Sequence, residues 1–157
     1  MASIVEELGD LEKLQKELEY LQTHAVKVGV LGNGSADGVS VQVYAIFNEY
    51  GTSHIPKRPF FRLSVGTENV QNRIKEYMNM QIEMIIQGEI SGQEAYEKLG
   101  SFVVQKIKKT IMNGDFAPLN PKTIKRKRHS RPLIDTRSLI NSISCREIGR
   151  ASCRERV

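Results

Sequence analysis

Residues 48–62, the most informative segment of the sequence, read Asn48-Glu49-Tyr50-Gly51-Thr52-Ser53-His54-Ile55-Pro56-Lys57-Arg58-Pro59-Phe60-Phe61-Arg62. Gly51 can take a positive φ, so the pattern predicts a helix over residues 40–50 that ends there. Pro56 and Pro59 fix their own φ angles and push the residues before them toward extended conformations. The sequence therefore predicts a stiff connection, followed by a large apolar anchor in Phe60 and Phe61.

Two further elements precede this stretch. Apolar residues at three- and four-residue steps predict an amphipathic helix over about residues 3–22. Its stripe can pack on its own domain, the interpretation we favour, or on a neighbour; it consists of Val5, Leu8, Leu11, Leu14, Leu18 and Leu21. Alternating valines predict a strand over residues 25–31, and the glycines of residues 32–38 predict a loop. Residues 39–50 fit both periodicities, and Gly51 favours the helix.

Helical patterns dominate the chain after this stretch. Amphipathic helices are expected over residues 64–87 and 92–113, the second opened by a Ser91-x-x-Glu94 capping box, and together they predict an antiparallel hairpin. Asn120-Pro121 predicts a short basic helix over residues 121–128. Asp135 or Thr136 can cap a last short helix through Ile143. The predicted fold class is α+β, with a small, mostly antiparallel sheet packed against the N-terminal helix and the long helical hairpin.

The chain of 157 residues predicts a single domain over residues 1–148. Ser144-Cys145-Arg146-Glu147 recurs as Ser152-Cys153-Arg154-Glu155. We therefore expect residues 149–157 to be a disordered or non-native tail, and residues 145–148 to form only the stub of a strand. The two cysteines do not suggest a disulfide framework.

Charge is unevenly distributed along a chain whose net charge is +5 and whose pI is about 9.3. Residues 1–20 contain Glu6, Glu7, Asp10, Glu12, Glu17 and Glu19 against Lys13 and Lys16. Residues 106–131 contain Lys106, Lys108, Lys109, Lys122, Lys125, Arg126, Lys127, Arg128 and Arg131 against Asp115. Such a run is usually a solvated face, and otherwise contacts nucleic acid or an acidic protein partner.

Recognisable catalytic and metal-binding patterns are missing from the sequence. His24, His54 and His129 do not lie at metal-ligand spacing from another histidine or from a cysteine. The loop at residues 32–38 has neither of the two glycine spacings that bind phosphate, GxxxxGK[ST] and GxGxxG. No serine lies in a G-x-S-x-G nucleophile elbow. No apolar run approaches the ~20 residues that cross a bilayer, and the N-terminus does not resemble a signal peptide. We therefore expect a protein that is not an enzyme, needs no cofactor and assembles in a cytoplasm without a membrane.

Two blocks of the sequence carry a family resemblance. The first is Asn-Glu-Tyr-Gly-Thr followed by Ile-Pro-x-Arg-Pro-Phe, in residues 48–60. The second spans residues 117–127 and 132–143, and its core is Pro132-Leu133-Ile134-Asp135-Thr136-Arg137-Ser138-Leu139-Ile140-Asn141-Ser142-Ile143. Together they resemble the tail-completion and head–tail joining (neck) proteins of tailed bacteriophages, the Mu-like virion morphogenesis proteins, over roughly residues 26–143. That family usually has Gly where this chain has Arg137, so a positive-φ turn is not expected there.

The resemblance implies a structural virion protein at the neck, between the tail tube and the head connector. Such proteins act in tail completion, tail termination or head–tail joining, and they form rings, often sixfold, whose neighbours are the tail tube protein and head connector or adaptor proteins. Its interface or structural motif would comprise Tyr50, Gly51, Pro56, Arg58, Pro59, Phe60, Phe61 and Arg62. Phe60 and Phe61 would be core anchors or interface residues, and Arg58 and Arg62 would bind carboxylates bidentately, within a subunit or across an interface.

The basic segment has two interpretations within this framework. Lys122, Lys125, Arg126, Lys127, Arg128 and Arg131 could meet the acidic N-terminal helix of the next subunit, or line the ring channel and contact phage DNA loosely. The alternative function is a non-specific DNA-binding protein that uses residues 122–131.

Overall fold

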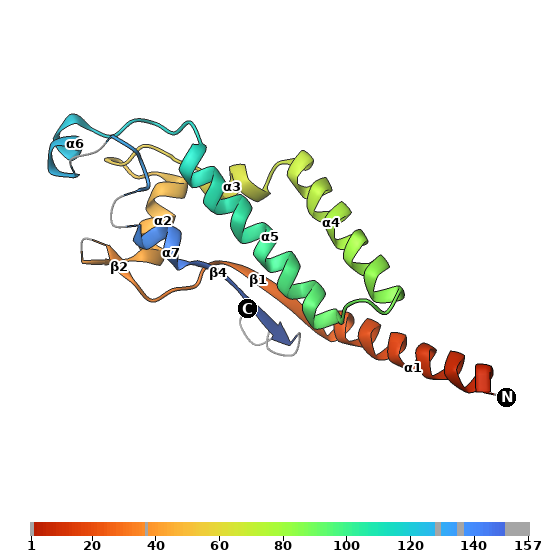
Figure 1. The fold of residues 1–157 in the computed structure, drawn as a ribbon. Helices are drawn as coiled ribbons and strands as arrows, with labels where there is room; N and C mark the ends of the chain where they lie inside the picture. The colour runs from red at the N-terminus through yellow and green to blue at the C-terminus, as the bar shows by residue number, and fades with distance from the viewer. Residues whose placement is uncertain (1, 37, 128–129, 135–136, 150–157) are drawn as a thin grey trace.

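The computed structural model describes residues 2–36, 38–127, 130–134 and 137–149. Within them the chain forms seven helices and four strands in an elongated α+β fold (Figure 1). The elements, in chain order, are α1 (Ala2–Thr23), β1 (His24–Val30), β2 (Ser35–Ala36), β3 (Val39–Ser40), α2 (Val41–Tyr50), α3 (Phe60–Val65), α4 (Glu68–Ile86), α5 (Gly92–Asn113), α6 (Pro121–Lys127), α7 (Ser138–Ser142) and β4 (Ile143–Gly149). No helix within this described part is long and apolar enough to span a membrane.

The central sheet consists of β1 and β4, which pair antiparallel from His24 opposite Gly149 to Val30 opposite Ile143. α5 lies across this sheet (Figure 1). A Cβ added at Gly100 of α5 would lie 2.8 Å from the Cys145 Sγ and 3.1 Å from the Val26 Cγ1. Glycine at position 100 therefore lets the helix approach both strands closely.

The expectation of a strand stub after Ile143 was wrong. β4 has seven residues, includes Gly149 of the expected tail, and matches β1 along its whole length. The alternation of apolar residues within β4 is weak, and its conformation is set by pairing with β1 and by contact with α5 rather than by local preference. Residues 150–157, the rest of the expected tail, lie outside the described residues.

The helical hairpin forms as predicted. α5 begins with the Ser91–Glu94 capping box, in which the Ser91 hydroxyl accepts the Glu94 N–H and the Glu94 carboxylate accepts the Ser91 N–H. The rings of Tyr77 on α4 and Phe102 on α5 stack with centroids 4.4 Å apart. These local and interhelical contacts place the two helices side by side and antiparallel (Figure 1).

The expected helix over residues 64–87 forms as α4 from residue 68 onward, but its expected start was wrong. The chain instead forms the short helix α3 and then α4. The Gly66 N–H donates to the Arg62 carbonyl and closes α3, and Thr67 is extended at the N-cap of α4. The hydrophobic periodicity runs through this break, so it did not reveal the change of direction.

The core lies where α2, α3, α5, α7 and the start of β4 meet. Its buried members are Val41, Ala45, Phe60, Ile107, Ile111, Leu133, Leu139 and Ile143. They come from α2, from both sequence blocks and from α5 between the blocks. The two blocks therefore belong to one hydrophobic cluster.

The helix α1 is only partly packed on its own domain. Near its C-terminus the Tyr20 hydroxyl donates to the Glu147 carboxylate, and the Leu21 carbonyl accepts the Tyr96 hydroxyl at 2.7 Å. Its N-terminal half projects beyond the α4–α5 turn (Figure 1). Leu14 and Leu21 are half-buried, whereas Leu11 is 62% exposed and Leu18 is 39% exposed, so the favoured interpretation that the leucine stripe packs on its own domain is confirmed for only part of the stripe.

Arg137 overturns another expectation. Its φ is 59° and its ψ is 8°, which is the left-handed helical region, and it occupies the N-cap of α7 without a side-chain cap. A positive φ therefore exists at the position where the resembled family has Gly. Asp135 and Thr136, the predicted caps, lie outside the described residues.

The strained backbone at Arg137 predicts that Arg137→Gly stabilises the protein. A non-glycine residue in the left-handed region costs about 1–2 kcal/mol, and the greater freedom of glycine in the unfolded chain offsets part of that gain. We expect the free energy of unfolding, measured in urea, to rise by about 0.5–1 kcal/mol. Arg137→Ala is the control, because it removes the same side chain but keeps the Cβ; equal effects of both substitutions would contradict this account.

Candidate functional site

The predicted motif begins where α2 ends at Gly51. Gly51 has a φ of 76°, and its N–H donates to the Phe47 carbonyl at 2.9 Å. A Cβ at this position would lie 2.8 Å from the Lys57 Cγ and 3.1 Å from the Ile55 carbonyl oxygen. Both the backbone angle and the close approach of the returning chain therefore require glycine here.

The connection from α2 to α3 is held by its own hydrogen bonds. The Thr52 N–H donates to the Ile55 carbonyl, and the Thr52 hydroxyl accepts the N–H groups of His54 and Ile55. After Pro56 the chain turns back, and the Arg58 N–H donates to the Asn48 carbonyl at 2.7 Å. This geometry agrees with the stiff connection that the two prolines predict.

Arg58 is the buried centre of the motif, with 4% of its surface exposed. Its Nε donates to the Ala117 carbonyl at 2.8 Å, its Nη2 to the Pro118 carbonyl at 3.1 Å, and its Nη1 to the Asn48 Oδ1 at 3.2 Å. Burial lowers the pKa of this guanidinium from its ordinary value, although an arginine keeps its proton in proteins. The side chain thus ties the end of α2 to the start of the second sequence block.

No carboxylate of the described residues contacts Arg58, so the expectation of a carboxylate partner within the subunit was wrong for that part of the chain, and a partner across an interface stays a prediction. The ion pairs found among the described residues are Lys13–Asp10 and Arg62–Glu49, and neither involves Arg58. Two backbone carbonyls and one side-chain amide surround the guanidinium instead. Because carbonyl groups carry no sequence signal, the sequence could not identify these partners.

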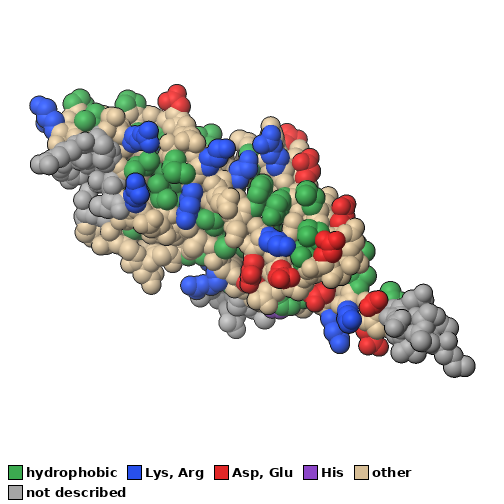
Figure 2. Space-filling view, viewed as in Figure 1, with side chains coloured by type: hydrophobic (Ala, Val, Ile, Leu, Met, Phe, Trp, Pro, Cys, Tyr) green, Lys and Arg blue, Asp and Glu red, His purple; other side chains and the backbone are tan. Residues whose placement is uncertain are grey.

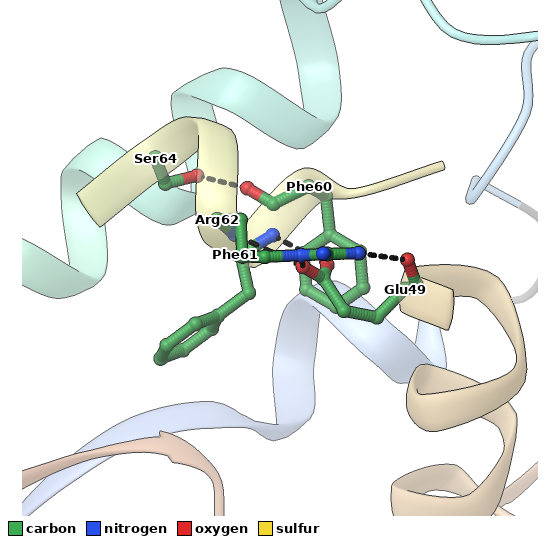
Figure 3. Close-up of polar contacts among 5 residues, drawn as sticks. All are labelled: Glu49, Phe60, Phe61, Arg62 and Ser64. Atoms are coloured by element: carbon green, nitrogen blue, oxygen red, sulfur yellow. Dashed lines mark hydrogen bonds and ion pairs between the residues drawn. The ribbon is translucent and has the colours of Figure 1, made fainter. Parts of the chain in front are cut away.

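Glu49 is the central residue that the sequence analysis missed. It is 7% exposed, and its carboxylate accepts the backbone N–H groups of Phe61 at 2.9 Å and Arg62 at 3.1 Å (Figure 3). Pro59 occupies the N-cap of α3 and makes no side-chain cap. Glu49 therefore supplies the capping oxygens that the first turn of α3 lacks, in favourable interaction with the helix dipole. The sequence did contain a signal for this contact: Glu49 is an acidic residue that precedes a helix start, at Pro59, where no side chain can act as the cap.

Arg62 completes this carboxylate site. Its Nε donates to the Glu49 Oε1 at 2.9 Å, and its Nη2 donates to the Glu49 backbone carbonyl at 3.0 Å. Its guanidinium also lies over the Tyr50 ring, 5.0 Å from the centroid. We expected Arg62 to bind a carboxylate either within its subunit or across an interface, and the contact found here lies within the chain. The Arg62 side chain contacts one carboxylate oxygen, so the expected bidentate geometry does not occur in this contact.

The two adjacent phenylalanines have different environments. Phe60 is 1% exposed and belongs to the core, and its carbonyl accepts the Ser64 hydroxyl (Figure 3). Phe61 is half-buried at the edge of that core. It lines a shallow hollow of about 330 Å³ beside α2, together with Val30, Gln42, Ala45, Ile46, Glu49, Tyr50, Phe60 and Arg62. Phe60 is therefore a core anchor, whereas Phe61 reaches the surface.

The basic residues lie apart from this motif, on and after α6. Asn120 caps α6 as predicted, because its Oδ1 accepts the Lys122 N–H at 3.0 Å. The side chains of Lys122, Lys125 and Arg131 are exposed. Arg126 and Lys127 belong to α6, and Arg128 lies outside the described residues. α6 stands at the opposite end of the molecule from the N-terminus of α1 (Figure 1).

Charge separates along the same long axis. On the face shown in Figure 2, Asp and Glu side chains gather over the half that contains α1 and the α4–α5 turn, and the other half shows mainly Lys and Arg. No group of three or more potential metal-ligating side chains occurs within the described ranges. The site thus offers structural clamps, apolar surface and charged ends.

Comparisons with known proteins yield no relative: no protein-family model, curated protein or solved structure matches this chain.

The Arg58 clamp predicts a large loss of stability in Arg58→Ala. The substitution leaves the carbonyls of Ala117 and Pro118 and the Asn48 amide oxygen without their donor, which should lower the free energy of unfolding by about 2–4 kcal/mol in urea titrations. Lys57→Ala is the matched control, since it removes the adjacent exposed cation and should change stability by less than about 0.5 kcal/mol. Similar losses in both variants would show that Arg58 is not a clamp.

Proposed function

We propose that this chain is a structural virion protein of a tailed bacteriophage. It forms a ring at the head–tail junction, where it acts in tail completion, tail termination or head–tail joining. The observation that carries this proposal is the junction of the two sequence blocks on which the resemblance rests. Arg58 of the first block bonds to Ala117 and Pro118, 59 and 60 residues away, at the start of the second. The two blocks therefore lie together in one structural unit, which supports treating them as a single pattern.

Core packing supports the same interpretation. Phe60 from the first block shares the hydrophobic cluster with Leu133, Leu139 and Ile143 from the second. Residues that match a family pattern for structural reasons should pack together in this way. The clamp and the core thus contain residues from both blocks.

The shape and charge of the subunit suit a closed ring. A ring needs a heterologous interface, in which one surface of a subunit meets a different surface of the next. This elongated chain has an acidic helix at one end and exposed lysines on α6 at the other (Figures 1 and 2). Its proposed partners are copies of itself, in a ring that the family resemblance suggests is hexameric, and the tail tube and head connector proteins on either side. Loose contact of the basic residues with DNA in the channel is compatible with this arrangement.

Non-specific DNA binding is the second candidate function. The exposed side chains of Lys122, Lys125 and Arg131 favour it, because clustered cations bind phosphates without reading bases. A protein with this function would bind duplex DNA as a monomer or dimer, and its affinity would fall steeply as salt rises.

Electron microscopy of lysates from the parent phage with this gene deleted tests the proposal. We expect DNA-filled heads beside separate tails if the protein joins heads to tails or completes the tail. We expect overlong tails if the protein terminates tail growth. The chain supplied from a plasmid should restore complete particles, which controls for effects on neighbouring genes. Complete, infectious particles without the protein would reject the neck function and favour the DNA-binding alternative.

A further inference from the structure

The outer face of α2 is unusual because it is apolar although it is exposed. The buried face of the helix contains Val41, Ala45, Asn48 and Glu49. The opposite face contains, at positions i, i+3, i+4 and i+7, Val43 (38% exposed), Ile46 (54%), Phe47 (41%) and Tyr50 (60%). A contiguous exposed apolar stripe on a helix commonly marks an interaction surface. α2 therefore presents a surface that lacks its cover in the isolated chain.

The solvent-facing side of α1 presents a second apolar surface. Leu11 and Leu18 are seven residues apart, so they lie on one side of the helix two turns apart, about 10 Å along its axis. Val43 and Tyr50 bracket the outer face of α2 with the same spacing. The two surfaces therefore match in length and in the helical rows that pack against each other.

We propose that the leucine face of α1 in one copy packs on the outer face of α2 in a second copy, head to tail. This inference rests on the proposed ring and names its subunit interface. The leucines of α1 would cover Val43, Ile46, Phe47 and Tyr50 and would reach the hollow beside Phe61, which is lined mainly by apolar side chains. A knob that fills such a hollow is the usual form of an energetically dominant interface contact.

Charge complementarity identifies the occupant as a second copy in this orientation. Residues 1–20 carry six acidic and two basic side chains, whereas the end of the molecule that carries α2 also carries α6, with Lys122 and Lys125 exposed (Figure 1). Docking of α1 at that end brings opposite charges together. A symmetric α1–α1 contact would instead place two acidic helices side by side and leave α2 uncovered.

Two complementary variants test this contact. Leu11→Glu blocks the α1 surface and keeps α2 intact, and Ile46→Glu blocks α2 and keeps α1 intact. Met80→Glu is the matched control, because Met80 is an apolar residue of α4 that is 57% exposed, compared with 62% for Leu11 and 54% for Ile46. The full chains are compared by native mass spectrometry and analytical ultracentrifugation. Circular dichroism checks the fold, and Leu11→Ser and Ile46→Ser replace any glutamate variant that does not fold.

The proposal predicts that the unmodified chain and Met80→Glu form the same closed oligomer, and that each blocked variant alone is monomeric. An equimolar mixture of the two blocked variants should give a one-to-one dimer, since a single intact α1–α2 contact remains. Failure of the mixture to pair, or oligomers of Ile46→Glu alone, would overturn the proposed contact. Both results leave the neck function open to its own test, because the deletion phenotype does not depend on which surfaces form the ring.

Discussion

A buried guanidinium that donates to two backbone carbonyls and one side-chain amide is the constraint on which this structure depends. Arg58 is held by the carbonyls of Ala117 and Pro118 and by the amide of Asn48. Burying a charge is costly unless its hydrogen bonds are made, so these three acceptors must stay in place once the core has formed. The planar fork of arginine fixes their directions, and lysine could not do so. The path of the chain after α5, and hence the position of the second block, follows from this contact.

The Glu49 carboxylate imposes a second constraint from the same helix. It accepts hydrogen bonds from the first turn of α3 and from the Arg62 side chain (Figure 3). These bonds join the two ends of the segment from Glu49 to Arg62 to each other. With the ends fixed, Phe60 enters the core and Phe61 lines the hollow beside α2. The polar clamp on the inner side of α2 thus holds its apolar outer face in a rigid setting. A preorganised surface of this kind loses little conformational entropy on association.

The sequence predicted those elements whose signals are local. The end of α2 at Gly51, the capping box of α5 and the Asn120 cap of α6 each depend on residues within one helical turn. The missed features depend on tertiary contacts. β4 depends on β1 and α5, the first turn of α3 depends on the capping contact from Glu49, and the partners of Arg58 include backbone carbonyls about 60 residues away.

The positive φ of Arg137 was missed, and the leucine stripe of α1 was only partly interpreted. A positive φ at an arginine is invisible in the sequence, because the residue type argues against it. The leucine stripe of α1 indicates an apolar surface but does not say which molecule covers it, and Leu11 and Leu18 stay exposed in the isolated chain. An apolar pattern on a projecting helix is therefore information about assembly as much as about folding.

In the proposed assembly, the Arg58 and Glu49 contacts fix one end of the subunit so that neighbouring copies can dock on it. Cryo-electron microscopy of the neck of the intact virion tests this proposal most directly. We expect a closed ring of copies of this α+β fold between the head connector and the tail tube, with α1 of each copy reaching α2 of the next. Neck density fully explained by other chains, with no place for this fold, would contradict it.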